Sequence, residues 1–320
     1  MSRSTKIWLV IATALVVSGI IMFGVIMSML KWDFTKLSTV KYETNDYRID
    51  EKFNNISINT DTAGIIFLPS DNGECRVVCY EQTKAKHCVD VSNDTLNVNI
   101  INERKWYDYI GINFGAPKIT VYLPESEYST VTVENSTGYI RIPQSFCFEG
   151  VSVLMSTGDV ECRADVKSSL KISLSTGDIE LDNISVGEAD LVVTTGDIEI
   201  NALKCEGGIK INVTTGDAEL ENVTCKTLLS KGSTGDITLE NVIATESFNI
   251  ERSTGDVTLE GCDAGNIIIK TDTGDVKGSL LSEKVFVTKT DTGKVKVPKT
   301  TSGGICEITT DTGNIIIDVK

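Results

Sequence analysis

The segment LSTGDIELDNISVGEADLVVTTGDIEIN, residues 174–201, decides the fold because it contains a full period of a repeat. Its two copies of Thr-Gly-Asp place Gly177 and Gly196 19 residues apart, and apolar residues alternate with polar ones on both sides of each copy. Alternation at every second position is typical of a β-strand with one buried face. A period of about 20 residues predicts a coil that stacks on copies of itself.

Thr-Gly recurs along most of the chain at steps of 19 or 20 residues. The residue two positions after each glycine is always apolar, and the residue four positions after it is apolar in all copies but one. A single coil cannot bury its own apolar row, whereas coils stacked about 4.8 Å apart join the rows into continuous ladders. We therefore predict an all-β fold, a right-handed parallel β-solenoid (β-helix) with coils of 19–20 residues, over residues 131–320. The repeated glycines are Gly138, Gly158, Gly177, Gly196, Gly216, Gly235, Gly255, Gly274, Gly293 and Gly313.

Each coil needs two turns to close. The first is Thr-Gly-Asp, where glycine relieves the steric cost of a positive φ and the flanking Thr and Asp can hydrogen-bond the local backbone. The second falls where an acidic residue precedes Asn, as at Asp182-Asn183 and Glu221-Asn222. The last coil ends at residues 318–320 without an evident cap, so its free edge predicts end-to-end self-association.

Residues 46–130 predict irregular coils of the same kind, before the regular repeat begins. Short alternating segments occur here, but Thr-Gly-Asp does not. We expect one of these coils to turn at Gly64 and to bury apolar residues on both sides of it. Those residues are Ile56, Ile58, Ile66 and Leu68.

An aromatic insertion, NERKWYDYIGINFGAPK at residues 102–118, interrupts the period within this region. Trp and Tyr often provide the main contacts with partners, but aromatic residues also cap the exposed apolar end of a solenoid. Two interpretations therefore stay open: a packed cap, and a recognition loop for an envelope protein, peptide or glycan. The partner-binding candidates are Trp106, Tyr107, Tyr109 and Phe114.

The N-terminal residues predict a membrane anchor. Residues 7–30 carry no charge, and a helix of about 24 residues is about 36 Å long, enough to span a hydrocarbon core of about 30 Å. Trp8 and Trp32 lie at its two ends, where indole rings favour the membrane interface. A cleaved signal peptide is the alternative, but the run exceeds a usual hydrophobic region and no A-x-A-like cleavage site follows it.

This anchor sets the expected domain order. We predict a short cytoplasmic N-terminus over residues 1–6, a transmembrane helix over 7–30, a linker over 31–45, and the coils beyond. The protein is thus expected to be a single-pass plasma-membrane protein with an extracytoplasmic C-terminal domain. A net charge of −15 argues against a nucleic-acid partner, because phosphate binding requires clustered Lys and Arg.

An Asp follows the glycine in seven consecutive coils. In stacked coils these carboxylates would lie about 5 Å apart and repel one another unless they are solvated, hydrogen-bonded or bridged by cations. A ladder of Ca²⁺ or Mg²⁺ sites is one interpretation, since hard cations take carboxylate oxygens. Turn capping on a solvated edge is the interpretation we favour, because the glycine-rich calcium-roll motif is absent. The residues are Asp159, Asp178, Asp197, Asp217, Asp236, Asp256 and Asp275.

The nine cysteines follow the repeat in part. Cys205 and Cys225 fall at the same phase of adjacent coils, and a Cα separation of about 4.8 Å would permit a disulfide. Small buried thiols in a core row are the favoured alternative. A second group lacks any recognised zinc spacing, so we predict no metal site and no cofactor. That group is Cys75, Cys79, Cys88 and His87.

Catalytic motifs are weak in this sequence. Asp-Thr-Gly at Asp272, Asp291 and Asp311 is similar to the loops of aspartic proteases, in which two carboxylates share a proton. Here it occurs in phase with the repeat, so successive copies should stack in parallel and not face each other. His87 is the only histidine, and no nucleophile-elbow or phosphate-loop motif is present. These observations predict a protein that is not an enzyme.

Three stretches carry a resemblance to a known family. FNNISINTDTAGI at residues 53–65, ITVYLP at residues 119–124 and the serial S-T-G-D-[IV]-x-L copies resemble the bacterial DUF4097 "putative adhesin" family, over residues 50–320. The resemblance implies a membrane-anchored β-strand repeat protein of the cell envelope, and it supplies no catalytic residues.

Three functions follow in order of expectation. The first is a non-enzymatic, membrane-anchored envelope protein that presents the solenoid as an adhesin-like or scaffold surface. The second is a sensor or regulatory partner in an envelope-stress response. The third and weakest is a polysaccharide-active enzyme, for which outward carboxylates are plentiful but no pair stands out.

Overall fold

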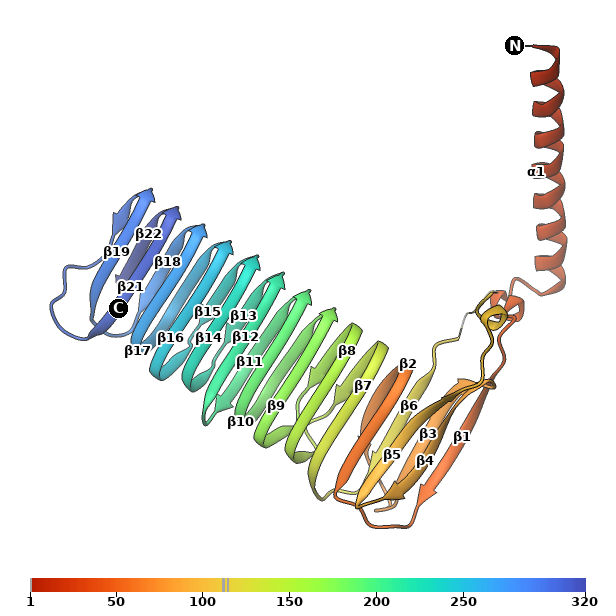
Figure 1. Ribbon diagram of the computed structural model, residues 1–320, viewed down its shortest axis with the longest axis horizontal. Coiled ribbons are helices and arrows are strands. Elements are labelled where there is room, and N and C mark those ends of the chain that lie inside the picture. The colour runs from red at the N-terminus through yellow and green to blue at the C-terminus, as the bar shows by residue number, and fades with distance from the viewer. Residues whose placement is uncertain (1, 111–112, 114) are drawn as a thin grey trace.

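The fold is a long β-solenoid with an apolar helix at its N-terminal end, seen in a computed structural model of the chain (Figure 1). The structure describes residues 2–110, 113 and 115–320. The helical elements are α1 (Arg3–Met29) and two short 3-10 turns, η1 (Phe34–Leu37) and η2 (Trp106–Tyr109). All strands of the described residues belong to one continuous sheet.

Six strands form the N-terminal part of the sheet, and the remainder form what we call the shaft, residues 127–320. The N-terminal strands are β1 (Tyr42–Ile49), β2 (Asn55–Pro69), β3 (Cys75–Gln82), β4 (Ala85–Ser92), β5 (Thr95–Asn102) and β6 (Lys118–Leu123). The shaft strands are β7 (Glu127–Ile142), β8 (Cys147–Cys162), β9 (Asp165–Thr176), β10 (Ile179–Thr195), β11 (Ile198–Cys205), β12 (Gly208–Thr215), β13 (Ala218–Glu221), β14 (Thr224–Thr234), β15 (Ile237–Glu240), β16 (Ile243–Thr254), β17 (Val257–Thr273), β18 (Val276–Leu280), β19 (Lys284–Thr292), β20 (Val295–Lys296), β21 (Gly304–Thr312) and β22 (Ile315–Val319).

The shaft confirms the predicted parallel solenoid. Ile179 of β10 pairs in parallel with Ile198 of β11, which in turn pairs with Ala218 of β13. All three side chains are fully buried, as are the corresponding positions of the neighbouring coils. The rows two and four residues after the glycines therefore form the continuous apolar core that the period predicted.

The Thr-Gly-Asp corners need glycine for two reasons. Gly177 has a φ of +125°, a conformation that L-residues with a side chain rarely adopt. A Cβ at this position would also lie only 2.2 Å from the carbonyl oxygen of Gly158 on the preceding coil. At the second corner Asn183 and Asn222 adopt left-handed φ values of 53° and 55°, as the turn pattern predicted.

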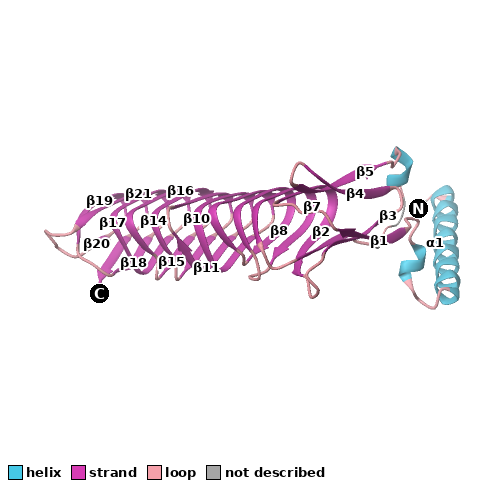
Figure 2. Cartoon of the chain, turned by 90° about the horizontal axis from the view of Figure 1, so that it is seen from below, coloured by secondary structure: helices cyan, strands magenta, loops and turns pink. Residues whose placement is uncertain are grey.

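The N-terminal part differs from a set of loose coils. Strand β2 is a true first coil that pairs in parallel with β7, and β5 and β6 pair in parallel with its other side. Strands β1, β3 and β4 instead run antiparallel to their neighbours and form the cap of the solenoid (Figure 2). Alternation of apolar and polar residues is the same in parallel and antiparallel strands, which is why the sequence pattern did not separate them.

The predicted corner of the first coil is wrong by one residue. Ala63, not Gly64, pairs with Gly138 of the next coil. Because side chains alternate between faces, the shift buries Ile65 and Phe67 in place of the predicted Ile66 and Leu68. Ile56 and Ile58 are buried as predicted.

The C-terminal coils do not stack in sequence order. Cys306 of β21 has Ile267 of β17 on one side and Phe286 of β19 on the other. Strand β22 likewise lies between β18 and β20. The last coil in the sequence is therefore the penultimate coil in space, and β21 does not form the free end. Residues 317–319 of β22 pair with β18 alone, so the free edge consists of β19, β20 and this end of β22.

Helix α1 matches the predicted apolar segment with slightly different bounds, and it is long and apolar enough to cross a membrane. In its 18-residue apolar window no residue is buried within the protein. Strand β1 begins at Tyr42, so the linker after the helix is shorter than predicted.

Candidate functional site

The Asp ladder is a hydrogen-bond ladder between coils. Oδ1 of Asp178 accepts a hydrogen bond from the main-chain N–H of Asp197 at 2.8 Å, and Oδ1 of Asp197 accepts one from Asp217 at 2.7 Å. The same bond joins Asp159 to Asp178 and continues through Asp236, Asp256 and Asp275. Each carboxylate thus accepts a hydrogen bond from a backbone N–H of the next coil, which supports the favoured turn capping; cation binding stays the untested alternative.

The ladder also follows the unusual coil order at the C-terminal end. Oδ1 of Asp275 accepts from the N–H of Asn314 at 2.7 Å, and Oδ1 of Asn314 accepts from the N–H of Lys294 at 3.1 Å. The amide oxygen of Asn314 therefore accepts the same backbone hydrogen bond that the carboxylate oxygens of the aspartates accept. This substitution indicates that the acceptor oxygen, not the negative charge, is what the corner requires.

The Asp-Thr-Gly residues do not form a catalytic pair. Asp272, Asp291 and Asp311 are exposed at corners of parallel coils, in the spatial order 272, 311, 291. Their strands stack side by side, as predicted, so the carboxylates do not meet across a cleft. The protease mechanism, which needs two facing carboxylates, has no basis here.

The cysteines are free thiols. Lys204 pairs with Thr224, which places Cys205 and Cys225 on adjacent coils as predicted, and both are buried. Burial raises the pKa of the Cys225 thiol to about 12, so the thiol is protonated at neutral pH. Cys205 and Cys225 are not joined in this structure, which agrees with the favoured buried thiols, and a disulfide between them stays the untested alternative.

The structure brings together Cys79, Glu81 and His87 in the core of the cap, whereas Cys88 is exposed. His87 Nδ1 lies 2.6 Å from Glu81 Oε2, and His87 Nε2 lies 2.8 Å from the hydroxyl of Thr60. Burial, together with the nearby Glu81 carboxylate, raises the pKa of Cys79 to about 12. Both ring nitrogens are hydrogen-bonded and the thiol is protonated, so the cluster functions as a polar core and not as a nucleophile.

The aromatic insertion lies at the corner of the coil that β5 and β6 contribute. Its η2 turn exposes Trp106 by 77%, Tyr107 by 48% and Tyr109 by 60%. These side chains do not pack over the core, because β1, β3 and β4 already cover that end. The packed-cap interpretation is therefore wrong for them. Phe114 lies outside the described residues.

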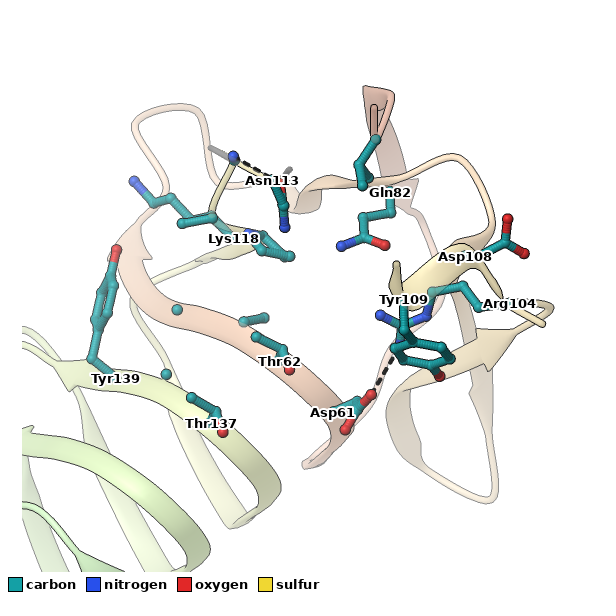
Figure 3. Close-up of a pocket in the computed structure, with 17 residues that line it drawn as sticks. Asp61, Thr62, Gln82, Arg104, Asp108, Tyr109, Asn113, Lys118, Thr137 and Tyr139 are labelled. Carbon is teal, nitrogen blue, oxygen red and sulfur yellow. Dashed lines mark hydrogen bonds and ion pairs between the residues drawn. The ribbon is translucent and has the colours of Figure 1, made fainter. Parts of the chain in front are cut away.

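A cavity of about 540 Å³, which we call the corner pocket, opens between the insertion and the first coils. Figure 3 shows Tyr139 and Lys118 on one side, and Asp61, Arg104 and Tyr109 on the other. The pocket exists because the insertion replaces the tight glycine corner that every shaft coil uses. It is lined by Val40, Asp61, Thr62, Ala63, Gly64, Gln82, Arg104, Asp108, Tyr109, Asn113, Gly115, Ala116, Pro117, Lys118, Thr137, Gly138 and Tyr139.

An ion pair organises one wall of the pocket. Nη2 of Arg104 lies 2.8 Å from Oδ2 of Asp61, and its guanidinium stacks 4.9 Å from the centre of the Tyr109 ring. Asn102 Oδ1 also accepts a hydrogen bond from Arg104 Nε at 2.9 Å. With only 11% of its side chain exposed, Arg104 is fixed by three partners. It presents a rigid cationic surface.

Two tyrosines shape the remaining walls. The Tyr139 ring covers Gly64, where a Cβ would lie 2.4 Å from a ring carbon, and Tyr42 covers Gly115 in the same way. The Tyr42 hydroxyl donates to Oδ1 of Asn113 at 2.9 Å. Glycine at residue 64 is thus required for packing of Tyr139, and not for the turn that the sequence suggested.

The sequence reasoning found Tyr109 but missed Asp61, Arg104 and Tyr139. These residues are 35–78 positions apart and belong to three different segments. The one available signal was Tyr139, which follows Gly138 where the next seven coils carry Asp. It marks the corner at which the repeat changes.

A family model described as Toastrack DUF4097 matches residues 53–217 and 207–320. The chain is similar to a "putative adhesin" of Bacteroides fragilis NCTC 9343 (17% identity, 88% of this chain and 97% of that chain, TM-score 0.40). It is also similar to a "putative adhesin" of Parabacteroides merdae ATCC 43184 (12% identity, 88% and 98%, TM-score 0.47). A "putative lipid binding protein" of Parabacteroides distasonis ATCC 8503 is 14% identical (88% and 98%, TM-score 0.48). A comparison with curated proteins finds no match.

Proposed function

The chain belongs to the Toastrack DUF4097 family, and from this premise we propose that it is a non-enzymatic, membrane-anchored surface protein that binds an envelope glycan in the corner pocket. The observation that carries the proposal is the pocket itself. It lies where the insertion interrupts the ladder of glycine corners, and its walls combine charged, amide and aromatic side chains.

The chemistry of the walls suits a sugar. The Asp61 carboxylate, the Arg104 guanidinium and the Asn113 amide offer hydrogen-bond acceptors and donors in planar arrays. Tyr109 and Tyr139 add apolar ring surface beside them, which matches the mixed character of a pyranose ring. A cavity of about 540 Å³ lies within the usual range for small-ligand sites, about 300–1,000 Å³.

Three features of the described residues support a non-enzymatic role. The corner aspartates are occupied by backbone donors, and the Asp-Thr-Gly carboxylates stack in parallel. The histidine is buried, and hydrogen-bonded through both ring nitrogens. The pocket itself pairs its buried cation with a carboxylate, so that no free general base faces a ligand.

The binding test uses the full chain in detergent or nanodiscs with purified wall glycans. Arg104→Ala and Lys118→Ala should each weaken binding at least about tenfold by removing a cationic hydrogen-bond donor from the pocket. Lys231→Ala is the matched control, because its amine pairs with Glu251 at 2.7 Å far along the shaft. Equal binding by all variants, or binding of peptides and not of glycans, would contradict the proposed ligand.

The anchoring and the side of the membrane are tested separately. Helix α1 supports a single-pass anchor with the shaft outside the plasma membrane. Carbonate extraction of membranes should leave the full chain in the pellet, and protease added to intact cells should degrade the shaft. A soluble chain, or a shaft protected until the cells are lysed, would contradict this topology.

A second candidate, a sensor of envelope state, is favoured by one contact. Val40 of the linker lines the corner pocket together with Arg104 and Tyr109, so a bound ligand would touch the segment that leads to α1. Under this function, ligand binding should slow hydrogen exchange of residues 38–44. If hydrogen exchange of residues 38–44 is unchanged when the ligand is bound, the sensor function is contradicted and only the scaffold function is left.

A further inference from the structure

We propose that the linker and the η2 turn form one lipid-facing surface, which rests in the headgroup region of the membrane that α1 spans. We call this surface the aromatic foot; it consists of Trp32, Phe34, Trp106, Tyr107 and Ile110. The inference rests on the membrane anchoring proposed above, and it concerns how the solenoid is held and not what it binds in the pocket.

Exposed aromatic side chains are confined to one end of the molecule. Beyond α1, the described residues expose the six aromatic side chains Trp32, Phe34, Tyr80, Trp106, Tyr107 and Tyr109. Every one of them precedes the shaft, whose described residues include no exposed aromatic. Scattered exposed apolar residues need no explanation, but a cluster at one end indicates a surface that meets an apolar or interfacial medium.

Contacts hold the exposed aromatic residues of the η2 turn next to the linker that follows α1. Val40 of the linker shares a cavity wall with Tyr107 and Ile110. The Lys41 carbonyl accepts from the N–H of Thr83 at 3.1 Å, and the Lys84 carbonyl accepts from Glu103 at 2.9 Å. Figures 1 and 2 both show the η2 turn at the end of the solenoid that faces α1. The linker and the insertion are therefore neighbours at one level of the molecule.

The position of Trp32 sets that level relative to the bilayer. It directly follows the last turn of α1, where its N–H donates to the Met27 carbonyl at 2.8 Å. If α1 spans the membrane, Trp32 lies at the interface, the region that Trp and Tyr prefer because they combine an apolar ring with a polar group. Trp106 and Tyr107, exposed by 77% and 48%, are the same kind of side chain.

The foot carries both paired and unpaired cations: Lys31, Lys41 and Lys105 have no carboxylate partner among the described residues, and Lys105 lies 6.0 Å from the centre of the Tyr107 ring. Lys84 is paired with Asp108, Arg104 with Asp61, and Lys36 with Asp33 at 3.7 Å. Paired cations contribute little to attraction by anionic lipids. An aromatic contact needs no anionic lipid, so it is expected to form on zwitterionic phosphatidylcholine and to persist in high salt, which separates it from electrostatic adsorption through the unpaired lysines.

The chain offers a direct test because its three tryptophans are Trp8, Trp32 and Trp106. In the double variant Trp8→Phe/Trp32→Phe, fluorescence reports on Trp106 alone, and in Trp8→Phe/Trp106→Phe it reports on Trp32. Each full-length variant is reconstituted in phosphatidylcholine vesicles with or without lipid brominated near the headgroup. All of these tryptophans are exposed, so replacing them does not disturb the core.

We expect brominated lipid to quench Trp106 to within about twofold of the quenching of Trp32, at low and at high salt. Quenching of Trp32 without quenching of Trp106 would overturn the aromatic foot and leave the anchoring intact. If neither tryptophan is quenched, the anchoring itself fails, and the inference fails with it. Trp106 shielded from both brominated lipid and aqueous iodide would assign the surface to a protein partner or a second copy instead.

Discussion

The guanidinium of Arg252 lies over Gly232 of the preceding coil, in the space that a side chain would otherwise fill. A Cβ at Gly232 would be 2.1 Å from Nη1 of Arg252. Arg252 is 4% exposed, and its Nη2 donates to the Ser230 hydroxyl at 3.1 Å, while Nε and Nη1 have no partner among the described residues. Burial lowers the pKa of Arg252 to about 10, although Asp217 and Asp236 oppose the shift.

This arrangement predicts that an apolar residue of similar length would stabilise the shaft. Arg252→Met removes a buried, incompletely paired charge and should raise the free energy of unfolding by about 1–3 kcal/mol in urea titrations. Gly232→Ala should lower it, because the added methyl group displaces the guanidinium. A loss of stability in Arg252→Met would contradict the inference that the buried guanidinium destabilises the shaft.

The glycine corners predict a severe cost for a single methyl group. Gly216→Ala places a Cβ 2.1 Å from the carbonyl oxygen of Gly196, at a φ of +134°, so the adjacent coils must separate. We expect this substitution to lower the free energy of unfolding by at least about 3 kcal/mol. Gly150→Ala is the matched control, since the nearest atom would be 3.7 Å away. Thermal unfolding of the two variants should differ by many degrees; equal midpoints would contradict the close approach.

The Asp ladder predicts stability that does not depend on divalent cations. The triple variant Asp159→Asn/Asp178→Asn/Asp197→Asn keeps the acceptor oxygens, as Asn314 does in the native chain, and it removes repulsion between stacked carboxylates without changing Asp217 and Asp236 near Arg252. Its unfolding midpoint should stay equal or rise at low salt, and Ca²⁺ or Mg²⁺ should not change the midpoint of the native protein. A midpoint that rises with Ca²⁺ only in the native protein would support the cation ladder instead.

The order of the C-terminal coils predicts an inverted pattern of hydrogen exchange. Peptides from β21 should exchange slowly, because this strand has a neighbour on both sides. Peptides from β19 and β20 should exchange faster, although they come earlier in the sequence, because they lie at the free edge. Mass spectrometry of native protein in D₂O distinguishes the two orders; faster exchange in β21, residues 304–312, than in β19 would restore sequential stacking.

The buried thiols predict a loss of stability in alkali. Burial raises the pKa of Cys75, Cys225 and Cys306 from the ordinary 9.0 to about 12. Between those values the unfolded chain loses thiol protons that the folded chain keeps, so stability is full below pH 9.0 and falls as pH rises toward 12. Ionisation of each of these thiols in the unfolded chain should lower the free energy of unfolding by about 1 kcal/mol at pH 10.

Urea titrations from pH 8 to 11 test this dependence. The Arg252 guanidinium has the opposite effect on stability, but only above about pH 10, where it begins to lose its proton in the folded chain.

In the native state at neutral pH, Cys88 should react first with maleimide, because it is exposed while Cys75, Cys225 and Cys306 are buried. Fast labelling of Cys225 would contradict the packing of its coil.

The repeat made most of the shaft predictable, because position in the period decides which side chains enter the core. Ile179 and Ile198 occupy the predicted rows, and Asn183 occupies the predicted second turn. The coil order was not predictable from the same signal. Every coil carries the same pattern, so Ile315 pairs equally well with Val276 or Val295, and in fact it pairs with both.

The pocket was beyond sequence reasoning for another reason. Its Asp61–Arg104 ion pair forms only after β2 and β5 are placed side by side, and no local pattern encodes that contact. The buried cluster of Cys79, Glu81 and His87 was partly visible in the sequence pattern. Cys79 and Glu81 alternate with exposed residues in phase with Val77, so an acidic residue in a core position was readable in advance.

The insertion of β21 and β22 between earlier coils bears on how the protein is made. A nascent chain presents its coils one at a time, and up to β18 each can settle on the one synthesised before it. Strands β19 and β20 then find no partner, because their neighbour has yet to be synthesised. The C-terminal end of the solenoid therefore cannot be completed until β21 and β22 are synthesised and insert beside β19 and β20. Coil-by-coil folding in sequence order stops one coil before the end of the solenoid.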